Sequence, residues 1–356
     1  MNNTDKTRNS MVDILKGIGM LIIILTHYNV SAEERLTCLF PFWVDPAVPI
    51  FIIISGYVYS MSYQKKNMVS ILDCYNYRFV VDKIIRYTIP FLLAYLVEVV
   101  FWITIKKDVS IYGIIVTAID GGSGPGSYYY PIMIQFIFTF PLVYFIVKKL
   151  DFAGVILCFL INGGYEVIQR SYGVSEGNYR LLLFRYIFLM SFGCYLYIGK
   201  TKPKKWVAII SMIIGAGWLV AYQYLKYQPR VIIYWSGTCL LAALWITPIA
   251  WLLLRSTRLS KIKCKPLELC GKASYNIFLT QMVFYISGIH AIYAYVESRA
   301  IQLVLCLVIN VTVGIVFYLI ENKITGHIIQ KVRERNYFEE MIKNIGSFLQ
   351  NKLTQK

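Results

Sequence analysis

Three side chains that can exchange protons or bind anions lie along the first apolar stretch of the chain, namely Asp13, Lys16 and His27. Lys16 and His27 are eleven residues apart. Because a helix rises about 1.5 Å per residue, these two share one face about 16 Å apart, and Asp13 joins that face within about 40°. An imidazole titrates near neutral pH and can act as a general base, while an ammonium group binds anions. The stripe predicts one wall of a polar cavity.

Spacing leaves a second interpretation of this stripe open. Lys16 could extend to the inner membrane interface, and His27 could end the helix near the outer one. Ionisable groups inside a membrane span are costly unless they face a cavity or a partner. Both interpretations satisfy that requirement, so the site remains a hypothesis at this point.

A second group of cations, Arg78, Lys83 and Arg86, precedes Pro90 at the start of another apolar stretch. Cations grouped at the beginning of a helix suit the phosphates of a ligand. The same residues would equally anchor the inner end of a membrane helix. The sequence predicts a cationic region there without choosing between these roles.

Five further polar side chains are candidates for contacting a substrate or a developing oxyanion. They are Ser55, Tyr130, Gln135, Arg185 and Gln281. Each also has a structural interpretation: helix packing for the Ser-Gly pair, an interfacial aromatic belt for the tyrosine, and packing polarity for the glutamines. Arg185 requires an acidic partner within a membrane, and Glu98 and Glu166 are the conceivable ones.

The elements that must position these side chains are membrane helices. Of the 356 residues, 57% are hydrophobic and 15% are charged, and the mean hydropathy is +0.56, whereas soluble domains carry about 25% charged residues. Continuous apolar runs near the length needed to cross a bilayer recur between short polar loops, which favours helices over a barrel. An all-α bundle of about ten spans is predicted, at residues 12–30, 47–63, 84–105, 129–147, 151–167, 181–199, 205–225, 231–254, 272–292 and 300–320.

The fifth of these spans is the weakest, because residues 162–164 read Asn-Gly-Gly. It is expected to be short, tilted or re-entrant. No internal repeat or second globular domain is found. Residues 1–324 are interpreted as one transmembrane domain, and residues 325–356 as an amphipathic tail on the inner membrane surface, with a partner-binding helix as the alternative.

The net charge of +17 is explained by the orientation of the chain in the membrane. With ten spans and both termini inside, 27 of the 36 Lys and Arg residues fall on inner segments. No nucleic-acid partner is therefore needed. The eight cysteines form no CxxC pair, and no histidine stands at ligand spacing, so they are interpreted as packing residues and no metal is expected.

Several separated motifs resemble the acyltransferase-3 family of bacterial integral membrane acyltransferases, over nearly the whole chain. The segment from Asp13 to Gly17, followed by His27, resembles the family's Asp-x-Leu-Arg-Gly and its later histidine. Residues 49–57 resemble Pro-x-Phe-Phe-x-x-Ser-Gly-Phe, and Lys83, Arg86 and Pro90 fit a basic segment that ends in Arg-x-x-x-Pro.

The later landmarks are residues 188–193, similar to a Phe-x-x-Gly helix, residues 269–281, similar to Gly-x-x-Ser-x-x-Ile-Tyr-Leu-x-His, and Glu321. Two positions depart from the family pattern. Lys16 replaces the usual arginine and loses its bidentate fork, and Gln281 replaces a frequent histidine. The second change predicts a residue that binds without titrating.

The resemblance implies an enzyme that moves an acyl group, usually acetyl, from cytoplasmic acetyl-CoA to a hydroxyl of an extracytoplasmic glycan or lipid-linked sugar, in the bacterial cytoplasmic membrane. Lys16, Arg78, Lys83 and Arg86 would then bind the coenzyme. His27 would accept the hydroxyl proton or carry the acyl group, with Asp13 orienting Lys16. A homodimer is compatible with this interpretation.

Two other classes of function remain as rivals. A polysaccharide or lipid-linked sugar exporter would use a polar helix cavity equally well. A lipid-linked glycosyltransferase usually needs acidic motifs in an outer loop, and only Glu33, Glu34 and Asp45 lie near the first span, without an Asp-x-Asp.

Overall fold

The computed structural model describes residues 10–107, 110–201, 204–227, 239–256 and 261–334. Within these ranges the chain is helical and contains no strand, which confirms the predicted all-α class. The α-helices are α1 (Ser10–His27), α2 (Ala32–Thr37), α3 (Phe40–Trp43), α4 (Ala47–Lys65), α5 (Ile71–Cys74), α6 (Tyr77–Phe101), α7 (Ile111–Ile119), α8 (Tyr129–Leu150), α9 (Phe152–Ser171), α10 (Glu176–Leu181), α11 (Ile187–Ile198), α12 (Lys205–Leu219), α13 (Leu240–Arg255), α14 (Lys265–Lys272), α15 (Ser274–Ser287), α16 (Ile289–Tyr295) and α17 (Arg299–Glu334). A 3-10 turn, η2 (Leu183–Tyr186), precedes α11, and π-helical turns η1 (Trp102–Lys106) and η3 (Val220–Tyr224) follow α6 and α12.

Seven helices or joined helices in the described ranges are long and apolar enough to cross a membrane, or eight if the bent pair α15 and α16 counts as one span. They are Ser10–His27, Phe40–Lys65, Ile71–Ile105, Tyr129–Leu150, Phe152–Gln169, Lys205–Tyr224 and Arg299–Glu334. The apolar helices Leu183–Ile198 and Leu240–Arg255 occupy two more of the predicted positions but are shorter. The chain is therefore a multi-pass helical protein, while the predicted count of about ten is not confirmed.

Two predicted spans differ in detail from the sequence expectation. The fifth, expected to be short, tilted or re-entrant, is the continuous helix α9 of 20 residues, and its glycines lie within regular helix. The ninth is bent by 54° where α15 meets α16. For the predicted span 231–254, residues 231–238 lie outside the described part, and the helix that is described begins at Leu240.

Glycines bring two helix pairs into direct backbone contact. A Cβ atom at Gly193 of α11 would lie 1.9 Å from the carbonyl oxygen of Ile53 in α4, and one at Gly56 would lie 2.2 Å from that of Met190. The α1–α14 pair is equally close, since a Cβ at Gly271 would lie 1.8 Å from the carbonyl oxygen of Asp13. Small residues at a helix interface permit this approach. The Ser-Gly pair of α4 therefore does pack closely, and Ser55 is held next to that contact.

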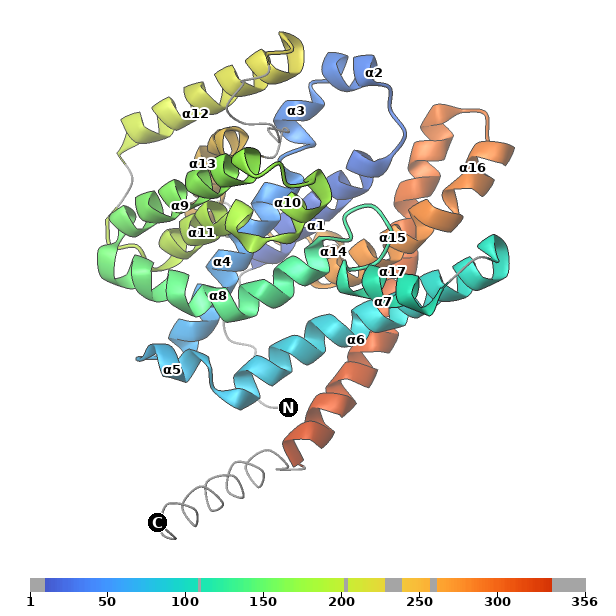
Figure 1. Cartoon of the computed structure of the whole chain (residues 1–356), viewed down its shortest axis with the longest axis horizontal. Coiled ribbons are helices and arrows are strands. Elements are labelled where there is room, and N and C mark those ends of the chain that lie inside the picture. Colours follow the sequence, from blue (N-terminus) through green and yellow to red (C-terminus); the bar gives the residue numbers. More distant parts are fainter. Residues whose placement is uncertain (1–9, 108–109, 202–203, 228–238, 257–260, 335–356) are drawn as a thin grey trace.

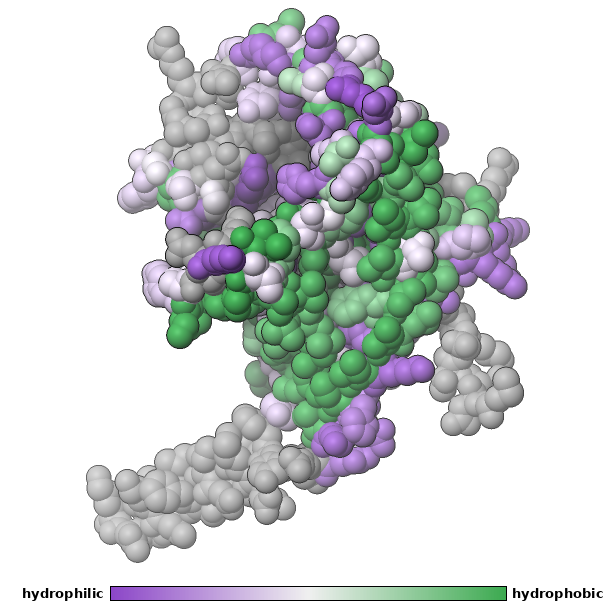
Figure 2. Space-filling view, turned by 90° about the vertical axis from the view of Figure 1, so that its right-hand side faces the viewer, coloured by the Kyte–Doolittle hydropathy of each residue, from purple (hydrophilic) through white to green (hydrophobic). Residues whose placement is uncertain are grey.

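Helix α17 runs along one side of the bundle (Figure 1), and many of its apolar side chains are exposed. Figure 2 shows that face as a broad hydrophobic area, with hydrophilic residues gathered toward its two ends. Exposed side chains along α17 include Val304, Val308, Val313, Val316 and Leu319. A lipid environment explains this distribution, because water would disfavour such an area on a soluble protein.

Helix α17 continues without a break past residues 324–325 to Glu334, and Thr325 and Ile329 are buried on it. The start of the predicted tail is thus an extension of the last apolar helix. The apolar residues on which the amphipathic tail was predicted, Phe338, Met341, Ile342, Ile345, Phe348, Leu349 and Leu353, lie outside the described residues.

Candidate active site

Lys16 and His27 of α1 line the same internal cavity, together with Ser55 of α4. The cavity volume is about 90 Å³, which is room for several water molecules. Its remaining wall residues are Met20, Ile23, Val48, Phe51, Tyr87, Gly126, Tyr128, Tyr129, Ser274, Tyr275 and Phe278. Two members of the stripe predicted from spacing, Lys16 and His27, therefore line one cavity.

His27 ends α1 beside α15. The ring of Tyr285 meets the imidazole edge-on at 6.0 Å between centroids, with 63° between the planes. The Tyr285 hydroxyl donates to the carbonyl oxygen of Ile24 at 2.8 Å, so α15 is fastened to the last turn of α1. On the other side, Gly126 is close to the ring, since a Cβ built on it would lie 3.8 Å from Nε2 of His27. The imidazole is therefore held between two elements.

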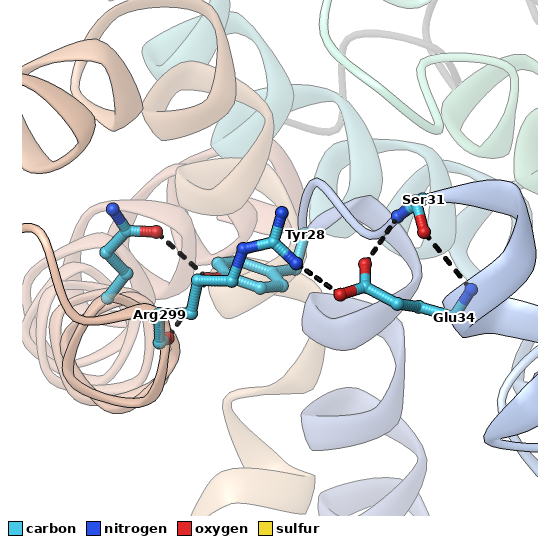
Figure 3. A network of polar contacts seen from close by, with 5 residues as sticks. Tyr28, Ser31, Glu34 and Arg299 are labelled. Atoms are coloured by element: carbon cyan, nitrogen blue, oxygen red, sulfur yellow. Dashed lines mark hydrogen bonds and ion pairs between the residues drawn. The ribbon is translucent and has the colours of Figure 1, made fainter.

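A network of polar contacts fixes the chain immediately after His27 (Figure 3). The Tyr28 hydroxyl hydrogen-bonds the carbonyl oxygen of Arg299 at 3.0 Å and the side-chain oxygen of Gln302 at 3.1 Å. The Arg299 guanidinium pairs with Glu34, whose carboxylate also closes the capping box of α2 with Ser31. The end of α1, the start of α2 and the start of α17 are thereby joined next to the cavity.

This network predicts a small acid dependence of stability. The pKa of Glu34 is lowered, mainly by hydrogen bonds from the backbone and hydroxyl of Ser31 and further by the charge of Arg299. A lowered folded-state pKa stabilises the fold at a pH above the ordinary Glu value of about 4.3, and that gain is lost as the pH falls through the folded-state value.

We therefore expect the thermal midpoint in detergent to fall more for the wild type than for Glu34→Gln when the pH is lowered from about 6 to about 3. The difference should be small because both side chains of the pair are partly or largely exposed. If the thermal midpoints of the two proteins fell equally over that pH range, the Glu34 carboxylate would have no part in the acid dependence of stability.

Asp13, the third member of the predicted stripe, is buried at 4% exposure and is not among the residues that line the cavity. Its backbone packs against Gly271 of α14. The structure therefore puts Asp13 at the α1–α14 contact, one turn from Lys16. Its predicted function of orienting Lys16 stays a prediction.

The four cations predicted to bind a coenzyme do not converge on one pocket. Arg78 lines a separate surface basin with Lys66, Asp82 and Arg333, and Arg333 pairs with Asp82. Arg86 is exposed.

Lys83 connects the two regions. Its ammonium lies 3.9 Å from the centre of the Tyr59 ring, and it interacts electrostatically with Lys16, Arg86 and Lys66. Lys83 is therefore near one cation of the basin, Lys66, and near the cavity residue Lys16.

Of the five substrate candidates, only Ser55 lines the cavity, and its hydroxyl donates to the carbonyl oxygen of Phe51 at 2.8 Å. The ring of Tyr130 instead stacks on Phe91 at 3.9 Å. Gln135 holds the backbone around η2, donating to the carbonyl oxygen of Leu181 at 2.7 Å and accepting from the amide of Leu183 at 3.0 Å. Tyr130 therefore packs against an aromatic ring, and Gln135 supports the backbone around η2.

Arg185 is buried among aromatic rings. Its guanidinium lies 4.8 Å from the centre of the Tyr179 ring. The hydroxyl of Tyr179 donates to Glu166 at 3.2 Å, and that carboxylate also interacts electrostatically with Arg185. Of the two conceivable acidic partners, Glu166 belongs to this cluster, whereas Glu98 accepts hydrogen bonds from Ser123.

Gln281 of α15 is fully buried, and neither amide atom has a hydrogen-bond partner among the described residues. It lies between Phe278, which lines the cavity, and Tyr285, which contacts His27. These three positions share a face at helical spacing. A buried amide without partners is costly, typically about 1–3 kcal/mol.

The sequence interpretation missed the tyrosines that dominate the cavity wall, namely Tyr87, Tyr128, Tyr129 and Tyr275. The run of three tyrosines before Pro131 was the available signal, and it drew attention to Tyr130. The rotation of α8 about its axis decides which of these tyrosines line the cavity. Tyr128 and Tyr129 do so, whereas the ring of Tyr130 stacks on Phe91.

No group of three or more His, Cys, Asp or Glu side chains in the described ranges lies close enough together to hold a metal ion. A family model described as an acyltransferase domain, Acyl_transf_3, matches residues 9–319. No curated protein and no solved structure gave a significant match. The matched range includes every cavity residue named above.

Proposed function

This chain belongs to the acyltransferase-3 family, and from that premise we propose that it transfers an acyl group, namely acetyl, from acyl-CoA to a hydroxyl of a glycan or lipid-linked sugar. The family supports a membrane acyltransferase in general terms. The donor, the transferred group and the acceptor are our proposals. The observation that carries them is the cavity in which Lys16, His27 and Ser55 meet.

The cations support a coenzyme donor. A CoA molecule carries phosphates at one end and its thioester at the other, so it needs positive charge at a distance from the reacting atoms. Lys66 and Arg78 line the surface basin, and Lys83 lies between that basin and Lys16 in the cavity. We place the basin on the cytoplasmic side because the positively charged segments favour that orientation.

His27 supplies the proton chemistry. The acceptor hydroxyl gives its proton to the imidazole as its oxygen attacks the thioester carbonyl. The C–S bond then breaks, and the departing CoA thiolate takes the proton from the imidazolium, which restores neutral His27. A positioned general base of this kind contributes about 10²–10⁴-fold to a rate.

The cavity also offers hydroxyl groups for the developing oxyanion. The wall tyrosines carry such hydroxyls, and Ser55 would join them by exchanging its bond to the Phe51 carbonyl. Preorganised donors at such a position are worth about 3–4 kcal/mol each in the best-studied enzymes. Aromatic walls suit a sugar ring as well, because its apolar face can pack on them. We propose that the acceptor enters at the His27 end and the donor at the Lys16 end.

A transfer assay tests this function directly. Membranes that contain the protein should convert labelled acetyl-CoA to free CoA and labelled glycan, and mass spectrometry of surface glycans should show loss of acetyl groups when the protein is absent. An unmodified polymer that crosses the membrane without consumption of acetyl-CoA would instead establish the exporter. Release of CoA without labelled glycan would overturn the proposed acceptor.

A further inference from the structure

A glycine-rich segment, residues 121–127, passes beside His27 at Gly126, and we call it the glycine roof. At Gly126, φ is +89°, and a Cβ there would lie 2.9 Å from the Phe278 ring as well as 3.8 Å from Nε2 of His27. At Gly124, a Cβ would lie 2.8 Å from backbone atoms of Met282. The roof therefore rests on α15, and the Phe278 ring occupies the place that a side chain at position 126 would take.

Glu98 of α6 fastens the roof. This carboxylate is only 2% exposed, and its Oε2 accepts from the amide of Ser123 at 3.0 Å and from the Ser123 hydroxyl at 3.2 Å. At Gly122, φ is +103°, and a Cβ would lie 3.2 Å from both carboxylate oxygens. A buried carboxylate persists only where hydrogen bonds compensate for lost water. The proposed acyl transfer gives Glu98 no chemical step, so its place in the protein is explained by the roof.

Gly126, Phe278 and His27 line one cavity, and this is where the proposed reaction takes place. Reacting groups in an enzyme come within about 3–3.5 Å of one another. A methyl group at position 126 would lie in van der Waals contact with Nε2 and too close to the Phe278 ring, so the ring would have to shift. Both effects would disturb the place where the acceptor hydroxyl meets His27 and the acyl group. Phe278 packs against Gly126 and lines the same cavity. The roof and the ring together therefore bound the part of the cavity in which the acyl group must fit beside His27.

We propose that Gly126 and Phe278 determine the length of the transferred acyl chain and restrict it to a short one, and that Glu98 is the positioning residue that holds Gly126 in place. This proposal rests on the proposed acyl transfer. Gly126 contributes by its lack of a side chain, Phe278 by its ring, and Glu98 through Ser123.

The size limit is tested with Gly126→Ala, Phe278→Leu and a matched control. Gly173→Ala is the control, because Gly173 also has positive φ (+60°) but no atom within 4 Å of its Cβ position. It tests the same unfavourable backbone conformation without the steric contact. We expect Gly126→Ala to lower kcat with acetyl-CoA by about 10²-fold and Gly173→Ala to leave it unchanged.

Phe278→Leu should act in the opposite sense and raise the ratio of propionyl to acetyl transfer. This variant decides the question alone if Gly126→Ala does not fold. An unchanged ratio in Phe278→Leu, or equal activity of the two alanine variants when both fold, would overturn the size limit.

The positioning role is tested without relying on catalysis. Diethyl pyrocarbonate modifies exposed imidazoles, and peptide mapping separates His27 from His290 and His327. Glu98→Leu should speed modification of His27 several-fold, whereas Glu98→Gln, which keeps an acceptor oxygen for Ser123, should stay near the wild-type rate. Equal rates in all three proteins would overturn the role of Glu98. Because this readout needs no acyl transfer, a failure of the proposed function would be recognised separately.

Discussion

Replacing His27 by alanine is expected to abolish acyl transfer while the protein still inserts and folds. The imidazole faces the cavity, and a general base of this kind contributes about 10²–10⁴-fold to the rate. Removal of the ring leaves Lys16 and Ser55 in place, so donor binding should persist. The measurement is the rate of CoA release and of label transfer to glycan in membranes with matched protein levels.

The two other histidines provide matched controls for this variant. His290 and His327 are both exposed and lie outside the cavity wall, so alanine at either position should leave the rate near that of the wild type. Activity retained in His27→Ala would remove the imidazole from catalysis. An acyl-enzyme trapped on His27 in the wild type would favour covalent transfer over direct transfer.

The second large effect is expected at Gly193, where alanine should destabilise the bundle. The new Cβ would be placed 1.9 Å from the carbonyl oxygen of Ile53. This oxygen belongs to the backbone and cannot rotate away, so α4 and α11 must separate. Overpacking of a tight interface costs about 1–3 kcal/mol and occasionally more. A lower thermal midpoint in detergent, with Ser55 displaced and activity reduced, is the expected result.

Gly217→Ala in α12 is the control for the Gly193 experiment. Nothing lies within 4 Å of its Cβ position, and the site is exposed, so alanine should be neutral or slightly stabilising, by up to about 1 kcal/mol from helix propensity. Equal thermal midpoints for Gly193→Ala and the wild type would mean that the helices do not approach as closely as the structure shows. Gly56→Ala, which meets Met190 from the other side, should reproduce the effect.

Two glutamines in apolar helices show how far local sequence patterns predict a functional role. Gln135 was a candidate for substrate contact, yet its amide nitrogen and its amide oxygen both hydrogen-bond the backbone around η2. Gln281 has the same side chain and the same apolar surroundings in sequence, but it has no partner among the described residues. The sequence around the two glutamines does not distinguish them, because their hydrogen bonds depend on which segment packs against each helix in the fold.

The sequence by itself determined the helical class and the common face of Lys16 and His27. Both follow from local physics: continuous apolar runs must satisfy their backbone hydrogen bonds within each segment, and the period of about 3.6 residues sets which side chains align. The family resemblance, carried by motifs along most of the chain, was confirmed by the match to residues 9–319.

Only the tertiary structure decided which side chains from different helices meet. It placed Ser55, Tyr129 and Tyr275 around His27, separated Arg78 from Lys16, and brought the glycine roof beside the imidazole. Each outcome depends on how a helix is rotated about its axis and on backbone contacts such as that between Gly193 and Ile53. Those contacts join residues far apart in the chain, so no local pattern contains them.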